Sequence, residues 1–216
     1  ITEMLLASHR VECTTCDQSG ICKLQEYANR FGIHKVRFDN VYSQEPIDKT
    51  SPSIVRDPSK CILCAKCVRM CAEVQNISAI DICNRGRESY VSCGFGQSMI
   101  DTNCVGCGQC AAVCPTGALM EKSEIGRVDA AMKAGKYVIV QTAPAVRAAL
   151  GEEFGMKIGT PVTGKMVAAL RRLGFKKVFD TNFAADLTIM EEGTEFISRV
   201  TNGGVLPMMT SCCPGW

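Results

Sequence analysis

The sequence lacks an excess of charge of one sign, and it lacks long hydrophobic runs. Its 216 residues include 24 basic and 22 acidic side chains, a formal net charge of +2. No large uniform field therefore points to nucleic acid or to an anionic membrane surface as a partner. No window approaches the roughly 20 consecutive apolar residues of a membrane-spanning helix. We expect no nucleic-acid partner and no transmembrane segment.

Histidine is scarce and no segment looks like a secretory signal, whereas cysteine is abundant. The chain has two histidines and 15 cysteines, most of the latter at the spacing of metal ligands. Metal binding needs deprotonated thiols, which a reducing compartment keeps available. We therefore expect a cytoplasmic protein. Because 46% of the residues are hydrophobic and 21% charged, the composition is that of a globular chain.

Two copies of the pattern C-x2-C-x2-C-x3-C stand at residues 61–71 and 104–114. In bacterial ferredoxins, three cysteines of such a run bind one 4Fe-4S cluster and the fourth binds the other cluster. Disulfides or zinc are the alternatives, but zinc sites use cysteine pairs separated by longer loops. The spacing therefore predicts one cluster held by Cys61, Cys64, Cys67 and Cys114, and a second held by Cys104, Cys107, Cys110 and Cys71.

A third candidate metal site precedes these motifs, in the pattern His9-x3-Cys13-x2-Cys16-x5-Cys22. On spacing alone zinc would accept this set. The two iron-sulfur motifs that follow favour a third 4Fe-4S cluster, which would extend an electron path. An imidazole in place of a thiolate removes a negative charge and should raise the reduction potential, as in Rieske centres.

The N-terminal half is expected to hold short elements around these motifs. Residues 1–9 read as the end of a helix, and residues 20–30 form a helix that Gly32 ends. Residues 39–60 have the composition of a linker. Between the ferredoxin motifs, residues 80–93 read as a hairpin. Cys83 and Cys93 fall outside the ligand spacing, so we expect both to be small buried hydrophobic residues.

After residue 119 the pattern changes to alternating helices and strands, which predicts a parallel sheet with crossover connections. Functional groups would gather at the C-terminal ends of its strands, in residues 141–145 and 209–216. The expected helices are 125–134, 145–154, 164–173 and 184–201, and the expected strands are 136–141, 177–180 and 205–209.

Cys212 and Cys213 are neighbours in the second of these segments. In an extended chain adjacent side chains point in opposite directions, so one thiol could bind metal while the other faces another space. A bound thiol has lost its proton, whereas a free thiol with a pKa near 8.5 keeps it at neutral pH and can donate it. A pair of buried structural cysteines is the alternative.

The segment Thr-Ser-Cys-Cys-Pro-Gly-Trp at 210–216 resembles the first signature of iron-iron (FeFe) hydrogenases. Residues 142–147 and 180–192 match the same catalytic domain, and the cysteine motifs resemble the family's accessory domains. The resemblance implies that Cys213 binds the 4Fe-4S part of the H-cluster and that Cys212 donates a proton to the bridging amine of its di-iron part. It also places Ala143, Pro144 and Ala145 beside the cyanide ligands.

Glu192, Glu195 and Arg199 share one face of the helix before the signature. Ordinarily such a face is solvated and contains a weak ion pair of about 0.3–0.5 kcal/mol. The resemblance implies instead that these three side chains belong to a proton path from the surface to Cys212. Carboxylates pass protons well only if partial burial brings their pKa toward the working pH.

The expected fold is multidomain, with α+β iron-sulfur domains followed by an α/β domain. Residues 1–48 form the domain with one histidine and three cysteine ligands, 49–122 the two-cluster ferredoxin-like domain, and 123–216 the N-terminal part of the H-cluster domain. Residues 1–8 resemble the tail of a preceding 2Fe-2S domain, and both ends look cut. The expected cofactors are three 4Fe-4S clusters here, and an H-cluster and a 2Fe-2S cluster in the complete enzyme.

The resemblance implies reversible oxidation of H2 to protons and electrons. Electrons would pass through the clusters to redox subunits of an NAD(P)- or flavin-linked, ferredoxin-linked, electron-bifurcating or formate-linked hetero-oligomer. The first alternative is a non-catalytic electron-transfer subunit of the NADH dehydrogenase or formate dehydrogenase type. A degenerate hydrogenase that acts as a sensor is the second.

Overall fold

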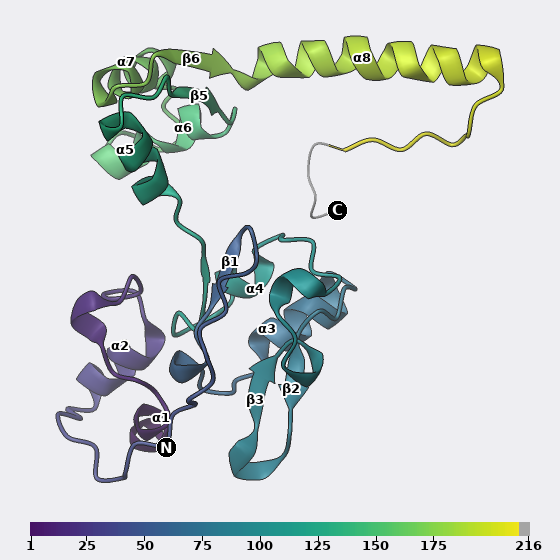
Figure 1. The fold of residues 1–216 in the computed structure, drawn as a ribbon. Helices are drawn as coiled ribbons and strands as arrows, with labels where there is room; N and C mark the ends of the chain where they lie inside the picture. The colour runs from purple at the N-terminus through teal and green to yellow at the C-terminus, as the bar shows by residue number, and fades with distance from the viewer. Residues whose placement is uncertain (212–216) are drawn as a thin grey trace. The chain divides into compact units, whose positions relative to one another are not determined.

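The computed structural model describes residues 1–211, apart from the side chain of Phe95. The chain divides into two compact units, residues 1–122 and residues 123–210 (Figure 1). Each is described by itself. Among the described residues, no helix is both long enough and apolar enough to cross a membrane.

The first unit begins with two helices, α1 (Thr2–Ala7) and α2 (Lys23–Arg30). Both confirm the helices expected in these segments. Phe31 ends α2, and Gly32 follows with a φ of 63°, in the left-handed region that glycine tolerates. Between the helices the chain makes a single 3-10 turn, η1 (Cys13–Thr15), so the first cysteines lie in loops.

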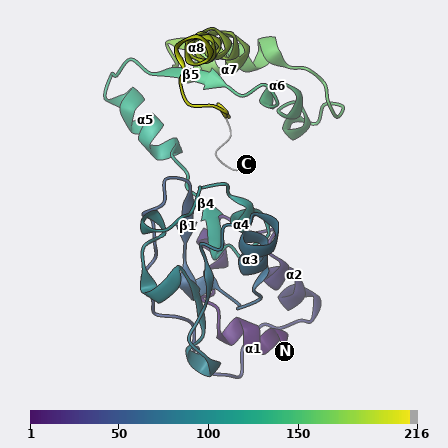
Figure 2. The ribbon, with the colours of Figure 1, turned by 90° about the vertical axis from the view of Figure 1, so that its right-hand side faces the viewer.

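Strands β1 (Ile54–Arg56) and β4 (Leu119–Glu121) pair antiparallel, with Ile54 opposite Glu121 (Figure 2). The expectation of a linker over residues 39–60 is therefore wrong for its last part. Ser51 and Ile54 are buried, and the residues of the turn η2 (Pro58–Lys60) are buried as well. The prolines and polar residues that suggested a linker instead make the turns that lead into and out of a core strand.

The two ferredoxin motifs continue into short helices, α3 (Lys66–Arg69) followed by one π-helical turn, η3 (Met70–Val74), and α4 (Gln109–Ala112). Cys67 and Cys110 belong to the hydrophobic core of this unit, together with Ile54, Ile80, Val91, Cys93, Met99 and Leu119. The core is thus assembled around the cysteine motifs. Short turns complete the unit: η4 (Gly86–Glu88), η5 (Gly94–Gly96) and η6 (Met99–Asp101).

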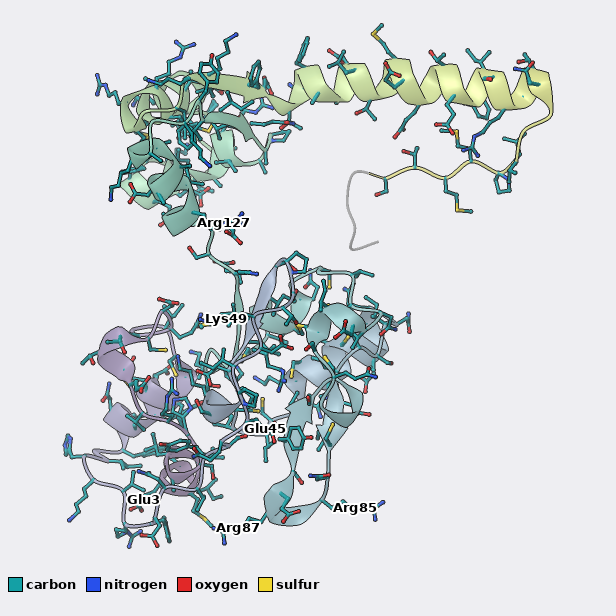
Figure 3. All side chains as sticks on the ribbon, viewed as in Figure 1. Glu3, Glu45, Lys49, Arg85, Arg87 and Arg127 are labelled. Carbon is teal, nitrogen blue, oxygen red and sulfur yellow. The ribbon has the colours of Figure 1, made fainter. Side chains whose placement is uncertain are left out.

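The hairpin expected between the motifs is confirmed, with β2 (Asp81–Cys83) paired antiparallel to β3 (Tyr90–Ser92). Arg85 and Arg87 lie at its tip (Figure 3). Cys93 is 0% exposed, as expected, but Cys83 is only partly buried.

The second unit contains β5 (Ile139–Thr142) and β6 (Lys177–Asp180), which pair in parallel in the register Val140 to Val178. Its helices are α5 (Ile125–Lys133), α6 (Val146–Ala149), α7 (Thr163–Leu173) and α8 (Thr181–Asn202), with the turn η7 (Glu152–Phe154). The parallel pair and three of the four expected helices are confirmed. The fourth, at 145–154, is instead the short α6 followed by η7, with Gly151 between them.

The strand expected at residues 205–209 is wrong, because the chain there forms no regular structure. Pro207 has no N–H to donate to a ladder. Strand β6 pairs with β5, and no third strand joins that sheet in the part of the chain that the structure describes. An apolar run cannot act as a strand without a partner to bond.

Candidate metal centres

The first cavity is lined by all four cysteines predicted for one cluster: Cys61, Cys64, Cys67 and Cys114. Cys61 and Cys64 come from the loop that leads into α3, Cys67 lies in α3 itself, and Cys114 comes from the end of the second motif. Leu63 and Ala65 stand between them with φ of 55° and 57°. Such a left-handed conformation is costly for residues with a Cβ, so the loop is held in a shape that turns its sulfur atoms toward one space.

The second cavity is lined by Cys71, Cys104, Cys107 and Cys110, the other predicted set. Its loop has the same shape, because Gly106 and Gly108 have φ of 68° and 76° at the positions that match Leu63 and Ala65. The last cysteine of each motif thus lines the cavity of the other motif: Cys114 lines the first cavity and Cys71 the second. Ligation of iron by these eight side chains remains a prediction.

Backbone N–H groups favour thiolates in both cavities, whereas burial favours the protonated thiol unless a metal is bound. The N–H of Leu63 donates to Cys61 Sγ at 3.4 Å, and the N–H of Ala79 donates to Cys71 Sγ at 3.3 Å. Burial, reinforced by neighbouring cysteines, raises the pKa of Cys67 and of Cys110 to about 12. Without metal these thiols keep their protons at neutral pH, whereas a bound cationic centre stabilises the thiolate. The residues therefore fit an iron-sulfur group.

The third cavity is lined by His9, Cys13, Cys16 and Cys22. His9 is 7% exposed, and its Nδ1 lies 2.9 Å from the carbonyl oxygen of Lys60. A carbonyl only accepts, so Nδ1 carries the hydrogen and Nε2 is left as the metal ligand. Burial lowers the pKa of His9 despite this bond, which keeps the ring neutral, as ligation requires.

These side chains surround cavities and do not converge on a point. Among residues 1–211, no three or more His, Cys, Asp or Glu side chains are grouped as the ligands of a single ion. In a 4Fe-4S cluster the four cysteines are shared among the irons of one inorganic core, so the ligands enclose a space. The cavities provide that arrangement for each of the three predicted sets.

In the second unit, the C-terminal ends of β5 and β6 are tied together beside residues 143–145. Arg147 Nε donates to the carbonyl of Pro144 at 2.9 Å, and its Nη2 donates to Asn182 Oδ1 at 3.2 Å. Thr181 Oγ1 also donates to the carbonyl of Thr142. Ala143, Pro144 and Ala145 are exposed at this edge, the position expected for functional groups on a parallel sheet.

The three side chains of the predicted proton path lie on α8, but the structure joins only two of them. Arg199 Nε donates to Glu195 Oε1 at 2.9 Å, and Arg199 Nη1 donates to the carbonyl of Val205 at 3.1 Å. Glu192 is half-buried and Glu195 is exposed. Arg199 therefore also fixes the chain that leaves the helix. Cys212 and Cys213 lie outside the described residues.

Sequence reasoning missed the side chains that hold these sites in place. Lys60 lines the third cavity and is the neighbour in sequence of Cys61, a predicted ligand in the first cavity. Thr116 Oγ1 donates at 2.8 Å to the Lys60 carbonyl, which also accepts from His9. Arg147 clamps the ends of two strands. A lysine or threonine next to a ligand carries no recognisable spacing of its own, although Arg147 is part of the segment that suggested the resemblance.

Three family models match separate parts of the chain. Residues 136–216 match the iron only hydrogenase large subunit, C-terminal domain. Residues 1–37 match the iron-sulfur binding region of NADH-ubiquinone oxidoreductase-G, and residues 51–120 match the ferredoxin-like domain of NADH-quinone oxidoreductase subunit 3. The predicted ligands in the described residues all fall within the last two matches.

Two curated relatives are similar over nearly the whole chain. The NADP-reducing hydrogenase subunit HndD of Solidesulfovibrio fructosivorans is 51% identical over 100% of this chain and 38% of its own length. Iron hydrogenase 1 of Clostridium pasteurianum is 42% identical over 98% of this chain and 37% of its own length. The chain thus spans less than two fifths of either relative.

A solved structure, the NAD+-reducing [NiFe]-hydrogenase in the H2-reduced state, is also similar. It is 35% identical with a TM-score of 0.52, over 56% of this chain and 52% of that one. HndD and iron hydrogenase 1 extend the similarity across both units, through the predicted iron-sulfur sites and the hydrogenase segment. On the cysteine motifs, the cavities they line and these matches, the chain belongs to the iron-iron hydrogenase family, as part of a multi-cluster large subunit.

Proposed function

We propose that the protein to which this chain belongs catalyses the reversible oxidation of H2 to protons and electrons. The observation that carries the proposal is the order of sites along one chain. Three cavities lined by predicted cluster ligands lie within residues 1–122, and they precede the segment that matches the hydrogenase C-terminal domain. Such an order suits a catalytic centre that exchanges electrons with a series of relays.

The proposed cofactors in this chain are three 4Fe-4S clusters, one in each cavity. In the complete enzyme an H-cluster would supply the chemistry of H2 itself, and a 2Fe-2S cluster would belong to a preceding domain. In this proposal the role of this chain is to bind the H-cluster and to orient it. Cys213 would hold the H-cluster, and Ala143, Pro144 and Ala145 would line its site from the exposed edge of the sheet in the second unit.

For the protons, we propose that Cys212 is the final donor and that Glu192, Glu195 and Arg199 form the route to it. The ion pair of Arg199 with Glu195 supports this role in one respect, because it fixes the rotamer of a carboxylate that would otherwise be free on an exposed helix. The half-burial of Glu192 is the other supporting feature.

The proposed partners are redox subunits of a cytoplasmic hetero-oligomer. Support comes from the names of similar proteins, which include a subunit of an NADP-reducing hydrogenase and the NADPH-Fe(3+) oxidoreductase subunit alpha of Geobacter sulfurreducens. The second is 37% identical over 56% of this chain. An NAD(P)-linked subunit would exchange electrons with the cluster closest to it.

The test of catalysis is the substitution Cys212→Ala in the complete enzyme. We expect an unchanged iron content and almost no H2 evolution, because the donor thiol is removed while the ligand Cys213 is kept. Cys83→Ala is the matched control, since Cys83 lies outside the three cavities, and it should leave turnover unchanged. Wild-type H2 evolution by Cys212→Ala would remove the donor role.

The second candidate function is electron transfer without catalysis. It is favoured by the matches of residues 1–37 and 51–120 to subunits of NADH-quinone oxidoreductases. The match of residues 136–216 favours the hydrogenase. Reduction of the clusters by H2 alone distinguishes the two, because a relay subunit has no site that oxidises H2. Clusters that NADPH reduces but H2 does not would support the second function.

A further inference from the structure

Lys60 is a buried lysine that lies between two of the predicted cluster sites. Its side chain is among those that line the cavity of His9, and it is 8% exposed as a residue. The next residue, Cys61, lines the neighbouring cavity. Lysine is almost never buried without a partner, so its position calls for a physical reason.

Both ends of Lys60 contact the ligand set of the third cavity. Its carbonyl oxygen accepts from His9 Nδ1 at 2.9 Å and from Thr116 Oγ1 at 2.8 Å. Its ammonium group donates to Cys16 Sγ at 3.8 Å. One residue therefore orients the imidazole through its backbone and contacts a predicted thiolate through its side chain.

The charges around this ammonium group are mixed. Asp57 Oδ2 lies 3.8 Å from Lys60 Nζ and 3.5 Å from Arg10 Nη2, and Arg10 also pairs with Glu12 at 3.0 Å. Asp57 is thus shared between two cations. The hydrogen bond to Cys16 is the contact that brings the charge of Lys60 directly onto a ligand.

We propose that Lys60 is a positioning residue that raises the reduction potential of the cluster at His9 and joins that cluster to the next. The inference rests on the proposed function, because it requires an iron-sulfur cluster in this cavity. Adding an electron increases the negative charge of the cluster and its ligands. A hydrogen bond to a ligand sulfur from a buried cation stabilises the reduced form more than the oxidised form.

The junction follows from the same contacts. From His9 the path crosses one hydrogen bond to the carbonyl of Lys60, whose carbon is bonded to the backbone nitrogen of Cys61. A second bridge runs from the N–H of Lys23 to the carbonyl of Pro115 at 3.2 Å, next to Cys22 and Cys114 respectively. The two predicted sites are therefore linked by two short hydrogen bonds, one from the His9 side chain and one between backbone groups, and Lys60 accepts the shorter of them.

The test is Lys60→Met in the complete enzyme, because methionine keeps the length of the buried stem and removes the charge. Each cluster is followed separately by a redox titration monitored by electron paramagnetic resonance. We expect the equilibrium constant for reduction of the cluster at His9 to fall about tenfold, a midpoint about 59 mV more negative for one electron. The cluster at Cys104 should be unchanged. Lys60→Arg should restore most of the wild-type potential.

Lys23→Met is the matched control. Lys23 also adjoins a predicted ligand, Cys22, but its side chain is 64% exposed and pairs with Glu26 at 2.7 Å. Solvent screens such a charge, so its removal should leave the potential unchanged. Asp57→Asn provides a change of opposite sign, because it removes the anion that competes for Lys60 and should make the potential more positive.

An unchanged potential in Lys60→Met, with the signal of the cluster at His9 still present, would overturn the inference. If Lys60→Met does not fold, Asp57→Asn tests the inference in its place. An unchanged or more negative potential of the cluster at His9 in Asp57→Asn would then overturn the inference. The presence of a third cluster is tested separately, by the metal content of the protein. Zinc in the complete wild-type enzyme, with about four irons fewer than the three 4Fe-4S clusters, the H-cluster and the 2Fe-2S cluster together require, would overturn both the third cluster and this role of Lys60.

Discussion

Gly106 occupies a position where a side chain would meet two obstacles. Its φ of 68° lies in the left-handed region, and a Cβ built on it would lie 2.7 Å from Ser53 Oγ. We expect Gly106→Ala to lose about 1 kcal/mol from backbone strain and a further 1–3 kcal/mol, roughly, from overpacking. Gly108→Ala is the matched control. It has a φ of 76° but nothing within 4 Å of the added Cβ, so only the first loss applies.

The assay compares the rates at which the iron-loaded variants lose their visible cluster absorbance at one guanidinium concentration without oxygen. A difference of about 1.4 kcal/mol corresponds to a tenfold ratio of rates, so Gly106→Ala should unfold about fivefold to a hundredfold faster than Gly108→Ala. Adding Ser53→Ala to Gly106→Ala should recover the excess, because the overlapping oxygen is gone. Equal rates for the two glycine variants would refute the role of Ser53 in packing against the second ferredoxin loop.

Three further predictions concern acid, metal uptake and protons. Burial raises the pKa of Asp48, but hydrogen bonds from Thr50 and other donors outweigh it and lower that pKa overall. The stability advantage of wild type over Asp48→Ala should therefore be present above about pH 4 and shrink below it. Thermal unfolding of both proteins at several pH values would measure this advantage. Because burial raises the pKa of Cys67 and Cys110 to about 12, iron must displace protons, and chelator competition should give tighter binding at higher pH. Glu192→Gln should slow H2 evolution with no loss of iron. A wild-type rate of H2 evolution would mean that Glu192 is an ordinary solvated side chain and has no role in the proton path.

Much of the site could be predicted from spacing because metal ligation depends on spacing. The motifs at 61–71 and 104–114 allowed the exchange of Cys71 and Cys114 between clusters to be predicted, and the structure places these cysteines in the expected cavities. A cysteine outside the pattern was harder to place. Cys93 is buried as expected and Cys83 is not, since burial depends on which face of a hairpin meets the core.

Pairing between distant segments could not be predicted in the same way. Residues 54–56 read as part of a linker, because nothing in their composition reveals that 119–121 will bond to them. The run at 205–209 has the composition of a strand, yet it forms none in the structure. A strand forms only when another strand pairs with it, and that partner can lie far away in the sequence.

The sequence by itself was enough to predict which side chains would carry the chemistry: the cysteine sets, His9 and the segments that match the hydrogenase family. Local spacing fixes these, because a thiolate loop must present its sulfur atoms at set intervals whatever surrounds it. Only the tertiary structure decided how the sites are held and connected. Lys60 orients His9 and contacts Cys16 while it adjoins Cys61. That relation joins residues 51 positions apart in the chain, so only the folded chain reveals it.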